Sequence, residues 1–310
     1  MASDPLSDAL AVRVRGLRMS YGTRAVLDGV DFDVRVGEVV CLLGPNGAGK
    51  TTTIEVLEGF RLRSAGGVEV LGVDPASGDD AWRARVGVVL QSWRDHARWT
   101  PRRLLEHLGG YFVPYATAER PRPYAVDWLL DTVGLTDDAD RKIGTLSGGR
   151  RRRLDVAVGI IGRPEVLFLD EPTAGFDPQA RRDFHDLVHR LSDLEGTSIL
   201  LTTHDLGEAE KLADRILILA GGRIVADGSA DALTRQVAAA SEVRWTCAGE
   251  RFVHATAEPT PFVRRLFEQH GDDVADLEVR RASLEDTYIA MVQRYESGSP
   301  AAAEFAEVPR

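Results

Sequence analysis

A glycine-rich loop that ends in lysine and threonine is the first part of the sequence that could do chemistry. Residues 44–52 fit the pattern G-x-x-x-x-G-K-[ST], in which backbone N–H groups and a lysine surround phosphate oxygens. The apolar run 39–43 precedes the loop and a predicted helix over 52–58 follows it, so the helix N-terminus adds partial positive charge. We therefore expect a phosphate site made by Gly44, Pro45, Asn46, Gly47, Ala48, Gly49, Lys50, Thr51 and Thr52.

Two adjacent carboxylates end another apolar run. Residues 166–169 predict a buried strand, and Asp170 and Glu171 follow at its carboxyl end, where ligands bind in open parallel sheets. We expect Lys50 to reach the β- and γ-phosphates, and Thr51 and Asp170 to bind Mg²⁺. Glu171 is expected to polarise an attacking water. The alternatives are a glycine-rich turn without a ligand and a strand that ends in two solvated acids; the joint occurrence of both motifs disfavours them.

The elements that must position these residues alternate between strands and helices. Short apolar runs are typical of parallel strands that are buried on both faces. Because helical stretches such as 178–194 lie between these runs, the sequence predicts an α/β domain with a mostly parallel sheet. The segment 30–36 alternates as a half-buried strand does, and 215–226 is typical of a hairpin. The buried strands are predicted at 39–43, 166–169 and 198–201.

Composition shifts along the chain predict its domains. We expect a flexible tail at 1–10, a main domain over 11–228, and a mainly helical insertion at about 93–161 within it. A smaller unit follows at 229–295, and a tail rich in Ala, Glu, Ser and Pro at 296–310 is expected to be disordered. Within the smaller unit, strands are expected at 242–247 and 274–280, and a helix from a capping box at 283–286 to about 295.

Composition also excludes several classes of protein. The 310 residues are 44% hydrophobic and 28% charged, which excludes a disordered or fibrous chain. The net charge of −10 disfavours nucleic acid as a partner. Two cysteines, Cys41 and Cys247, do not make a disulfide framework and fit a reducing cytosol. Since no apolar run approaches the length of a membrane helix, we expect any membrane crossing to be made by another chain.

A second motif identifies a family. Leu146, Ser147, Gly148, Gly149 and Arg150 stand before a predicted helix, between the glycine-rich loop and Asp170. With these motifs in this order, residues 11–230 resemble the ATP-binding subunit of ABC transporters. The resemblance implies an ATPase that uses ATP and Mg²⁺. It also implies a P-loop NTPase (RecA-like) α/β core with a mostly parallel sheet, an antiparallel β part, an inserted helical subdomain and a small α+β C-terminal extension.

Four further positions match the family one by one. Tyr21 looks like the aromatic residue that stacks on adenine, and Gln91 looks like the Q-loop glutamine that contacts Mg²⁺ or water. His204 looks like the H-loop histidine that contacts the γ-phosphate, and Asp177 like the D-loop aspartate at the dimer interface. The alternatives are an ordinary strand residue, a surface polar residue, a structural histidine and a helix start, respectively.

The signature motif implies a second copy of the ATPase. In the family, residues that match Ser147, Gly148 and Gly149 meet the γ-phosphate of ATP held by the opposite subunit. Two nucleotides are then enclosed between two subunits, so we expect a dimer, most simply a homodimer. Arg150 replaces the usual glutamine and begins a run that extends to Arg153. The run is interpreted as a partly solvated, salt-bridged helix, and a direct contact of Arg150 with the nucleotide is the alternative.

The resemblance narrows further to one branch. Residues 44–60 and 284–292 resemble daunorubicin-resistance-type exporters, in which the ATPase and the membrane protein are separate chains. The expected function is therefore efflux of a drug-like or lipid-like molecule through a polytopic permease subunit, with the ATPase at the cytoplasmic face of the cell membrane. Residues 92–101, rich in Trp and Arg, are expected either to contact that subunit or to form a helix-capping loop with buried Trp.

Two other functions stay open at this point. One is a soluble ABC ATPase that acts in macromolecular assembly without a membrane partner. The segment between Thr51 and Ser147 is too short for the long arm of DNA-repair relatives, and the single cassette differs from ribosome-acting members. The other is a nucleotide-binding regulatory module, which the intact Lys50, Glu171 and His204 disfavour.

Overall fold

The computed structural model divides the chain into two compact units, Met1–Ile224 and Val225–Arg310, with the boundary inside strand β9 (Arg223–Gly228). Gln91, residues 92–95 of the Trp- and Arg-rich segment, residues 1–8 and the whole of the predicted tail at 296–310 lie outside the described residues. No helix in the described part of the chain is long and apolar enough to cross a membrane. The structure describes residues 9–89, 96–173, 175–193, 195–237, 241–247, 250–256, 258–280, 284–285, 288–289 and 291–292.

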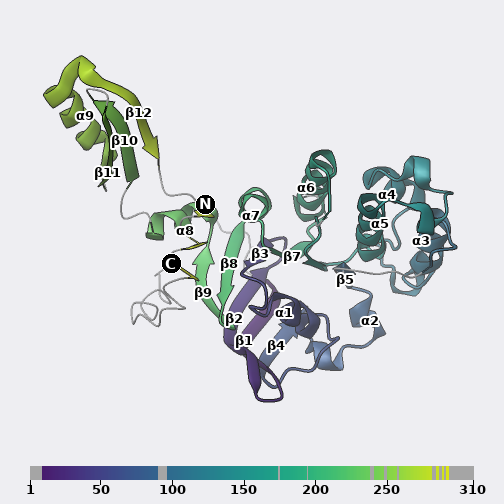
Figure 1. Cartoon of the computed structure of the whole chain (residues 1–310). Helices are drawn as coiled ribbons and strands as arrows, with labels where there is room; N and C mark the ends of the chain where they lie inside the picture. Colours follow the sequence, from purple (N-terminus) through teal and green to yellow (C-terminus); the bar gives the residue numbers. More distant parts are fainter. Residues whose placement is uncertain are drawn as a thin grey trace. The chain divides into compact units, whose positions relative to one another are not determined.

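A six-stranded sheet forms the centre of the first unit (Figure 1). The pairs β5–β6, β6–β7, β7–β3 and β3–β8 are parallel, as the sequence predicts. Every residue of β3, β6 and β7 is buried, because helices and a second sheet cover both faces of such strands. The strand order is β5 (Val86–Val89), β6 (Val166–Asp170), β7 (Ser198–Thr203), β3 (Val39–Leu43), β8 (Arg215–Ala220) and β9.

The order of these strands determines where the candidate site residues lie. Neighbouring parallel strands end at the same edge of the sheet, so the residues that follow β3, β6 and β7 come together there. The register pairs Asp170 with Thr202 and Leu43 with Thr203. One sheet edge therefore holds the glycine-rich loop, His204, and the two adjacent carboxylates Asp170 and Glu171 (the acidic pair).

A second sheet of the same unit is antiparallel, with the order β2–β1–β4. Its long strands are β1 (Leu10–Tyr21) and β2 (Arg24–Arg35), and β4 (Ala65–Val70) pairs with β1. Residues of β1 and β2 alternate between buried and exposed over much of their length, which is typical of a sheet with one covered face. The fold class expected from the sequence is confirmed by these two sheets.

Helices fill the connections of the first unit. Figure 1 shows α3, α4 and α5 grouped together, in the interval between β5 and β6 where the sequence predicts the helical insertion. Thr100 begins α3 by accepting a hydrogen bond from the N–H of Arg103. The helices of this unit are α1 (Lys50–Leu57), α2 (Asp80–Arg83), α3 (Pro101–Gly110), α4 (Val126–Thr132), α5 (Gly148–Ile160), α6 (Pro178–Asp193) and α7 (Leu206–Leu212).

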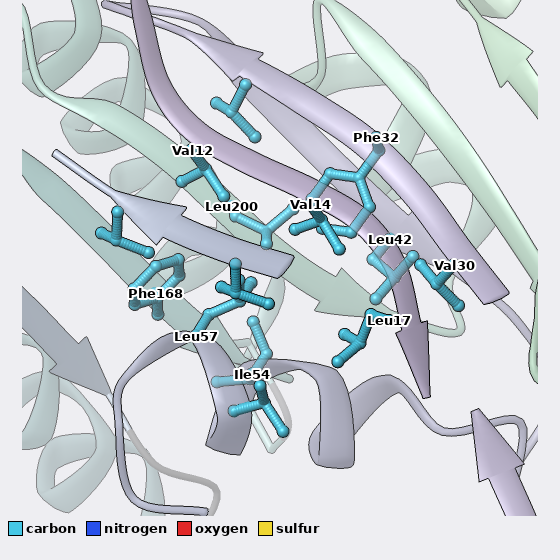
Figure 2. Packing of buried hydrophobic residues seen from close by; sticks show 14 of the residues in the cluster. Val12, Val14, Leu17, Val30, Phe32, Leu42, Ile54, Leu57, Phe168 and Leu200 are labelled. Carbon is cyan, nitrogen blue, oxygen red and sulfur yellow. The ribbon is translucent and has the colours of Figure 1, made fainter. Parts of the chain in front are cut away.

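Helix α1 lies in the main hydrophobic core. Figure 2 shows Ile54 and Leu57 of α1 beside Phe168 of the parallel sheet, with Val14 and Leu17 of the antiparallel sheet in the same cluster. All five are essentially inaccessible to solvent. Burying one such side chain is worth roughly 1.5–3 kcal/mol. The core therefore fixes α1, and with it the glycine-rich loop at the start of α1.

Glu58 at the end of α1 is half-buried, and its Oε2 atom is inaccessible to solvent. The pKa of Glu58 is raised from 4.5 to about 7, mainly by burial and further by the nearby negative charges of Glu55 and Asp170. Because the folded chain then binds the proton more tightly than the unfolded chain, the free energy of unfolding should fall as pH rises from 4.5 through about 7. We expect Glu58→Gln to remove about 1–2 kcal/mol of this pH-dependent loss.

Urea unfolding at pH 5 and pH 8 measures this effect. The wild-type chain should lose more stability between the two pH values than Glu58→Gln does. Glu210→Gln, an exposed position on α7, serves as the control and should keep the wild-type pH dependence. Equal pH dependence in all three chains would contradict the assignment of this loss to Glu58.

The second unit holds a small α+β structure. Its antiparallel sheet has the order β11–β10–β12, and the aromatic rings of Trp245 and Phe252 stack at 5.4 Å across β10 and β11. His254 of β11 stacks on Phe262 of α9 at 4.3 Å. Strand β11 is an element that the sequence analysis did not predict, and of the predicted last helix only 284–285, 288–289 and 291–292 are described. The elements are α8 (Ala230–Val237), β10 (Ser241–Cys247), β11 (Glu250–Thr256), α9 (Pro259–His270) and β12 (Val274–Arg280).

Candidate functional site

The glycine-rich loop turns sharply between β3 and α1. Gly49 has φ of 109°, and a Cβ there would lie 2.6 Å from the Leu27 side chain. A Cβ on Gly44 would lie 2.4 Å from the Leu219 carbonyl oxygen. Only glycine fits at these two positions, so the backbone N–H groups of the loop can approach a ligand closely.

Lys50 begins α1 at the end of this loop. Its side chain is buried, and Nζ donates to the carbonyl oxygens of Gly44 at 2.7 Å and Pro45 at 3.3 Å. Burial lowers the pKa of Lys50, while the charges of Glu171 and Asp170 oppose this effect. The ammonium group is thus held against the loop, where it can contact anionic phosphate oxygens.

A cavity of about 430 Å³ opens above the loop, a size typical of small-molecule sites. Its lining combines backbone N–H groups, hydroxyl groups, two cations and one carboxylate, which suits a polyphosphate. The side chain of Tyr21 contributes an aromatic ring to the same cavity, as expected for a base contact. The cavity is lined by Tyr21, Arg24, Val26, Asn46, Gly47, Gly49, Lys50, Thr51, Thr52 and Glu171.

Oxygen atoms suited to Mg²⁺ meet beside the cavity. The Thr51 hydroxyl donates to Oδ2 of Asp170 at 3.0 Å, and the Thr202 hydroxyl donates to Oδ1 at 2.5 Å. Asp170 is buried, so these bonds fix the direction of its carboxylate. Hydroxyl and carboxylate oxygens are ligands that Mg²⁺ prefers, and Mg²⁺ completes its shell with water and phosphate. Thr51 and Asp170 therefore fit the ion that the sequence predicts.

Glu171 and His204 form a pair at the cavity. Nδ1 of His204 lies 3.2 Å from Oε1 of Glu171, and the Glu171 side chain is 18% exposed. The backbone of Glu171 is left-handed, with φ of 46°, which is rare for a residue other than glycine. A carboxylate at a cavity wall with an imidazole beside it can accept a proton from a water molecule.

A buried carboxylate joins the two loops that carry this pair. Oε1 of Glu208 accepts from the Thr173 hydroxyl at 2.6 Å, and Oε2 accepts from the Thr203 hydroxyl at 2.5 Å. Thr173 follows Glu171 closely in sequence, and Thr203 directly precedes His204. Burial raises the pKa of Glu208, and the two hydroxyl donors oppose that shift.

The signature residues do not line the cavity of their own chain. Ser147 caps α5 by accepting a hydrogen bond from the N–H of Arg150 at 3.5 Å, and Ser147 and Gly148 are exposed. Gly149 follows in the first turn of the helix. The structure thus brings together the loop, the acidic pair, Tyr21 and His204, and leaves the signature outside that group.

Asp177 acts as a cap in this chain. Its carboxylate accepts a hydrogen bond from the N–H of Ala180 at 2.8 Å in the first turn of α6. This bond lowers the pKa of Asp177. Its predicted place at a dimer interface remains a prediction, as does the role of Gln91, which lies outside the described residues.

The interpretation of Arg150–Arg153 as a partly solvated, salt-bridged helix agrees with the structure only in part. Arg150 forms an ion pair with Asp138, with Nε 3.1 Å from Oδ2, which supports the salt-bridged interpretation. Arg152 departs from it, because its side chain is buried rather than solvated. One side of helix α5 packs against the turn at Asp170 and Glu171, and Arg152 lies on that side.

Sequence reasoning missed several residues of the site. Arg24 and Val26 line the cavity a few positions after Tyr21, and this nearness in sequence was an available signal. Thr202 and Glu208 act through contacts with residues distant in sequence, so no local pattern indicated them. Arg61 was also missed; its guanidinium lies 5.0 Å from the centroid of the Tyr21 ring.

Comparisons with known proteins agree with this geometry. A model of the ABC transporter family matches residues 27–174. The daunorubicin resistance ATP-binding protein DrrA2 of Streptomyces coeruleorubidus is 43% identical over 230 residues, 74% of this chain and 70% of that protein. The Nod factor export ATP-binding protein I of Ralstonia nicotianae is 37% identical over 306 residues, 91% of this chain and 93% of that protein.

Solved structures give the same result. The structure of an ATP-binding subunit of an ABC transporter aligns with a TM-score of 0.67 at 25% identity and covers 91% of this chain and 99% of that one. The ATP-binding cassette MJ1267 in its ADP conformation aligns with a TM-score of 0.60 at 26% identity over 71% of this chain and 91% of that one. The sequence, the site and these relatives show that the chain belongs to the ATP-binding subunits of ABC transporters and is an ATPase.

Proposed function

We propose that this ATPase powers the export of a drug-like or lipid-like molecule through a separate polytopic membrane subunit. The observation that carries the proposal is the cavity in which Lys50, Thr51 and Glu171 meet, in a chain whose relatives are named for drug resistance and for Nod factor export. The membrane subunit would hold the ATPase at the cytoplasmic face of the membrane.

The roles of the site residues follow from their positions. Lys50 and the N–H groups of the loop bind the phosphates, and Tyr21 stacks on the base. Thr51 and Asp170 would hold Mg²⁺, which would neutralise charge on the phosphates. Glu171 accepts a proton from the attacking water, and His204 orients Glu171 and faces the γ-phosphate.

The signature supports a dimer in this proposal. Ser147 stands exposed at the start of the 13-residue helix α5, where free N–H groups favour an anion. Ser147 and Gly149 do not line the cavity of their own chain, and a second copy would bring them to the nucleotide. ATP would then stabilise the closed dimer, and hydrolysis would release it.

An aromatic row in the helical insertion supports contact with the membrane subunit. The rings of His96, Trp99, His107 and Tyr111 follow one another at 5.0, 5.2 and 5.4 Å. Tyr111 is 63% exposed, and aromatic side chains are enriched where proteins bind each other. The row continues the Trp- and Arg-rich segment in which the sequence predicts that contact.

Transport in membrane vesicles tests the proposed function. Inside-out vesicles from cells that make the chain and its native membrane partner should accumulate a fluorescent anthracycline or a fluorescent phospholipid when Mg-ATP is supplied. Vesicles with Lys50→Ala should accumulate much less of either probe, because nucleotide binding is weakened. Accumulation that is equal with Lys50→Ala, or absent for both probes, would contradict the proposal.

A further inference from the structure

Arg152 is the most deeply buried member of the arginine run. It lies on α5, and its side chain is 5% exposed. Its guanidinium donates to three consecutive carbonyl oxygens, at the last residue of β6 and in the turn that follows it. Nη2 donates to Asp170 at 2.7 Å and to Glu171 at 3.0 Å, and Nε donates to Pro172 at 2.9 Å.

These carbonyl groups belong to the turn that carries the hydrolytic carboxylate. Strand β6 ends at Asp170, and the next residue, Glu171, takes the left-handed backbone conformation. Such a conformation persists in a residue other than glycine only where surrounding contacts hold it. On the other side of the turn, the N–H of Glu171 donates to the carbonyl and hydroxyl oxygens of Thr202 at 3.2 and 3.1 Å. The turn is therefore held from β7 on one side and by Arg152 on the other.

We propose that Arg152 is a positioning residue for ATP hydrolysis. It holds the left-handed turn so that the Glu171 carboxylate stays at the cavity wall. A guanidinium suits this task because its planar set of N–H groups reaches several carbonyl oxygens at once, which the single ammonium of lysine does not.

The same contact joins two functional parts of the chain. Helix α5 begins at the signature, where Ser147 is the N-cap. Arg152 follows Ser147 by less than two turns of the helix. A shift of the signature end of α5 is therefore transmitted to the turn at Glu171. This consequence rests on the proposed dimer: closure on the nucleotide held by one copy would adjust the carboxylate that serves the nucleotide of the other.

Steady-state ATP hydrolysis by the purified full-length chain tests the proposal. Arg152→Met removes all three hydrogen bonds, and we expect kcat to fall by roughly 30-fold or more, because small misplacements of a reacting group have large effects. The affinity for ATP should stay within about threefold, since the loop and Lys50 still bind the phosphates. Arg152→Lys should recover part of kcat.

A matched control comes from Arg120. Its guanidinium also donates to three carbonyl oxygens, those of Arg163, Pro164 and Glu195. None of these residues lines the cavity. Arg120→Met should lower thermal stability about as much as Arg152→Met and leave kcat unchanged. If both variants lose kcat in proportion to stability, Arg152 has only a structural role and the proposal is wrong.

A double variant separates positioning from a general effect. If Arg152 acts through Glu171, then Arg152→Met combined with Glu171→Gln should be no slower than Glu171→Gln alone. Multiplied losses would overturn the proposal. Should Arg152→Met fail to fold, Arg152→Lys in the same cycle gives the same decision. None of these assays needs a membrane subunit, so their failure is distinct from failure of the export proposal.

Discussion

Glu171→Gln is expected to slow ATP hydrolysis by roughly 10²–10⁴-fold, because the amide no longer accepts a proton from water. ATP binding should persist, since the loop, Lys50 and Tyr21 remain in place. Steady-state hydrolysis and equilibrium nucleotide binding measure the two effects separately. Glu210→Gln removes an exposed carboxylate from α7 and serves as the control, with wild-type rates expected.

The same variant should accumulate the proposed dimer. With Mg-ATP, light scattering should report twice the monomer mass for Glu171→Gln, because the nucleotide stays intact between the copies. Adding Gly149→Asp should return the chain to monomers, since a carboxylate at the signature repels the phosphates. Normal turnover by Glu171→Gln would remove Glu171 from the mechanism, and a dimer that forms equally without nucleotide would contradict an ATP-driven closure.

Lys50→Ala should have a comparable effect on binding. The variant removes the buried ammonium group of Lys50, which lies between the glycine-rich loop and the carboxylates of Asp170 and Glu171. Hydrogen bonds to charged groups contribute about 1.5–3 kcal/mol, so the Kd for ATP should rise by roughly 10- to 100-fold or beyond detection. Isothermal titration calorimetry with Mg-ATP measures this directly.

Lys211→Ala provides the comparison for this loss. Lys211 is exposed on α7, so its removal changes the net charge equally without touching the cavity. Its Kd should equal that of the wild type. Wild-type affinity in Lys50→Ala would show that the loop does not bind the phosphates of ATP.

The parallel sheet was predictable from the sequence for a clear physical reason. Strands such as β3, β6 and β7 are buried on both faces, so their apolar runs stand out from the polar sequence around them. Motifs at the ends of such strands lie at the sheet edge, where the structure has Lys50, Asp170 and His204, and the roles of these residues stay predictions. Strand β11 was missed because its residues in the 251–254 segment are all exposed and show no alternation.

The parts that were missed depend on packing between distant segments. Arg152 stands in a run of four similar residues, and only the direction from which α5 meets the turn after β6 decides which one is buried. Glu208 likewise becomes meaningful only when β6 and β7 lie side by side and bring Thr173 and Thr203 to it. Neither contact can be predicted from local patterns of hydrophobicity.

Recovery of the membrane subunit is the measurement that tests the export account most directly. Tagged Glu171→Gln protein should be isolated with Mg-ATP from detergent-solubilised membranes of the native cell, with Lys50→Ala as the control. If the chain works in export, a polytopic membrane protein should be retained with the tagged chain in stoichiometric amount. Recovery of soluble partners alone, or of a bare dimer, would contradict it and favour a soluble ABC ATPase that acts in macromolecular assembly.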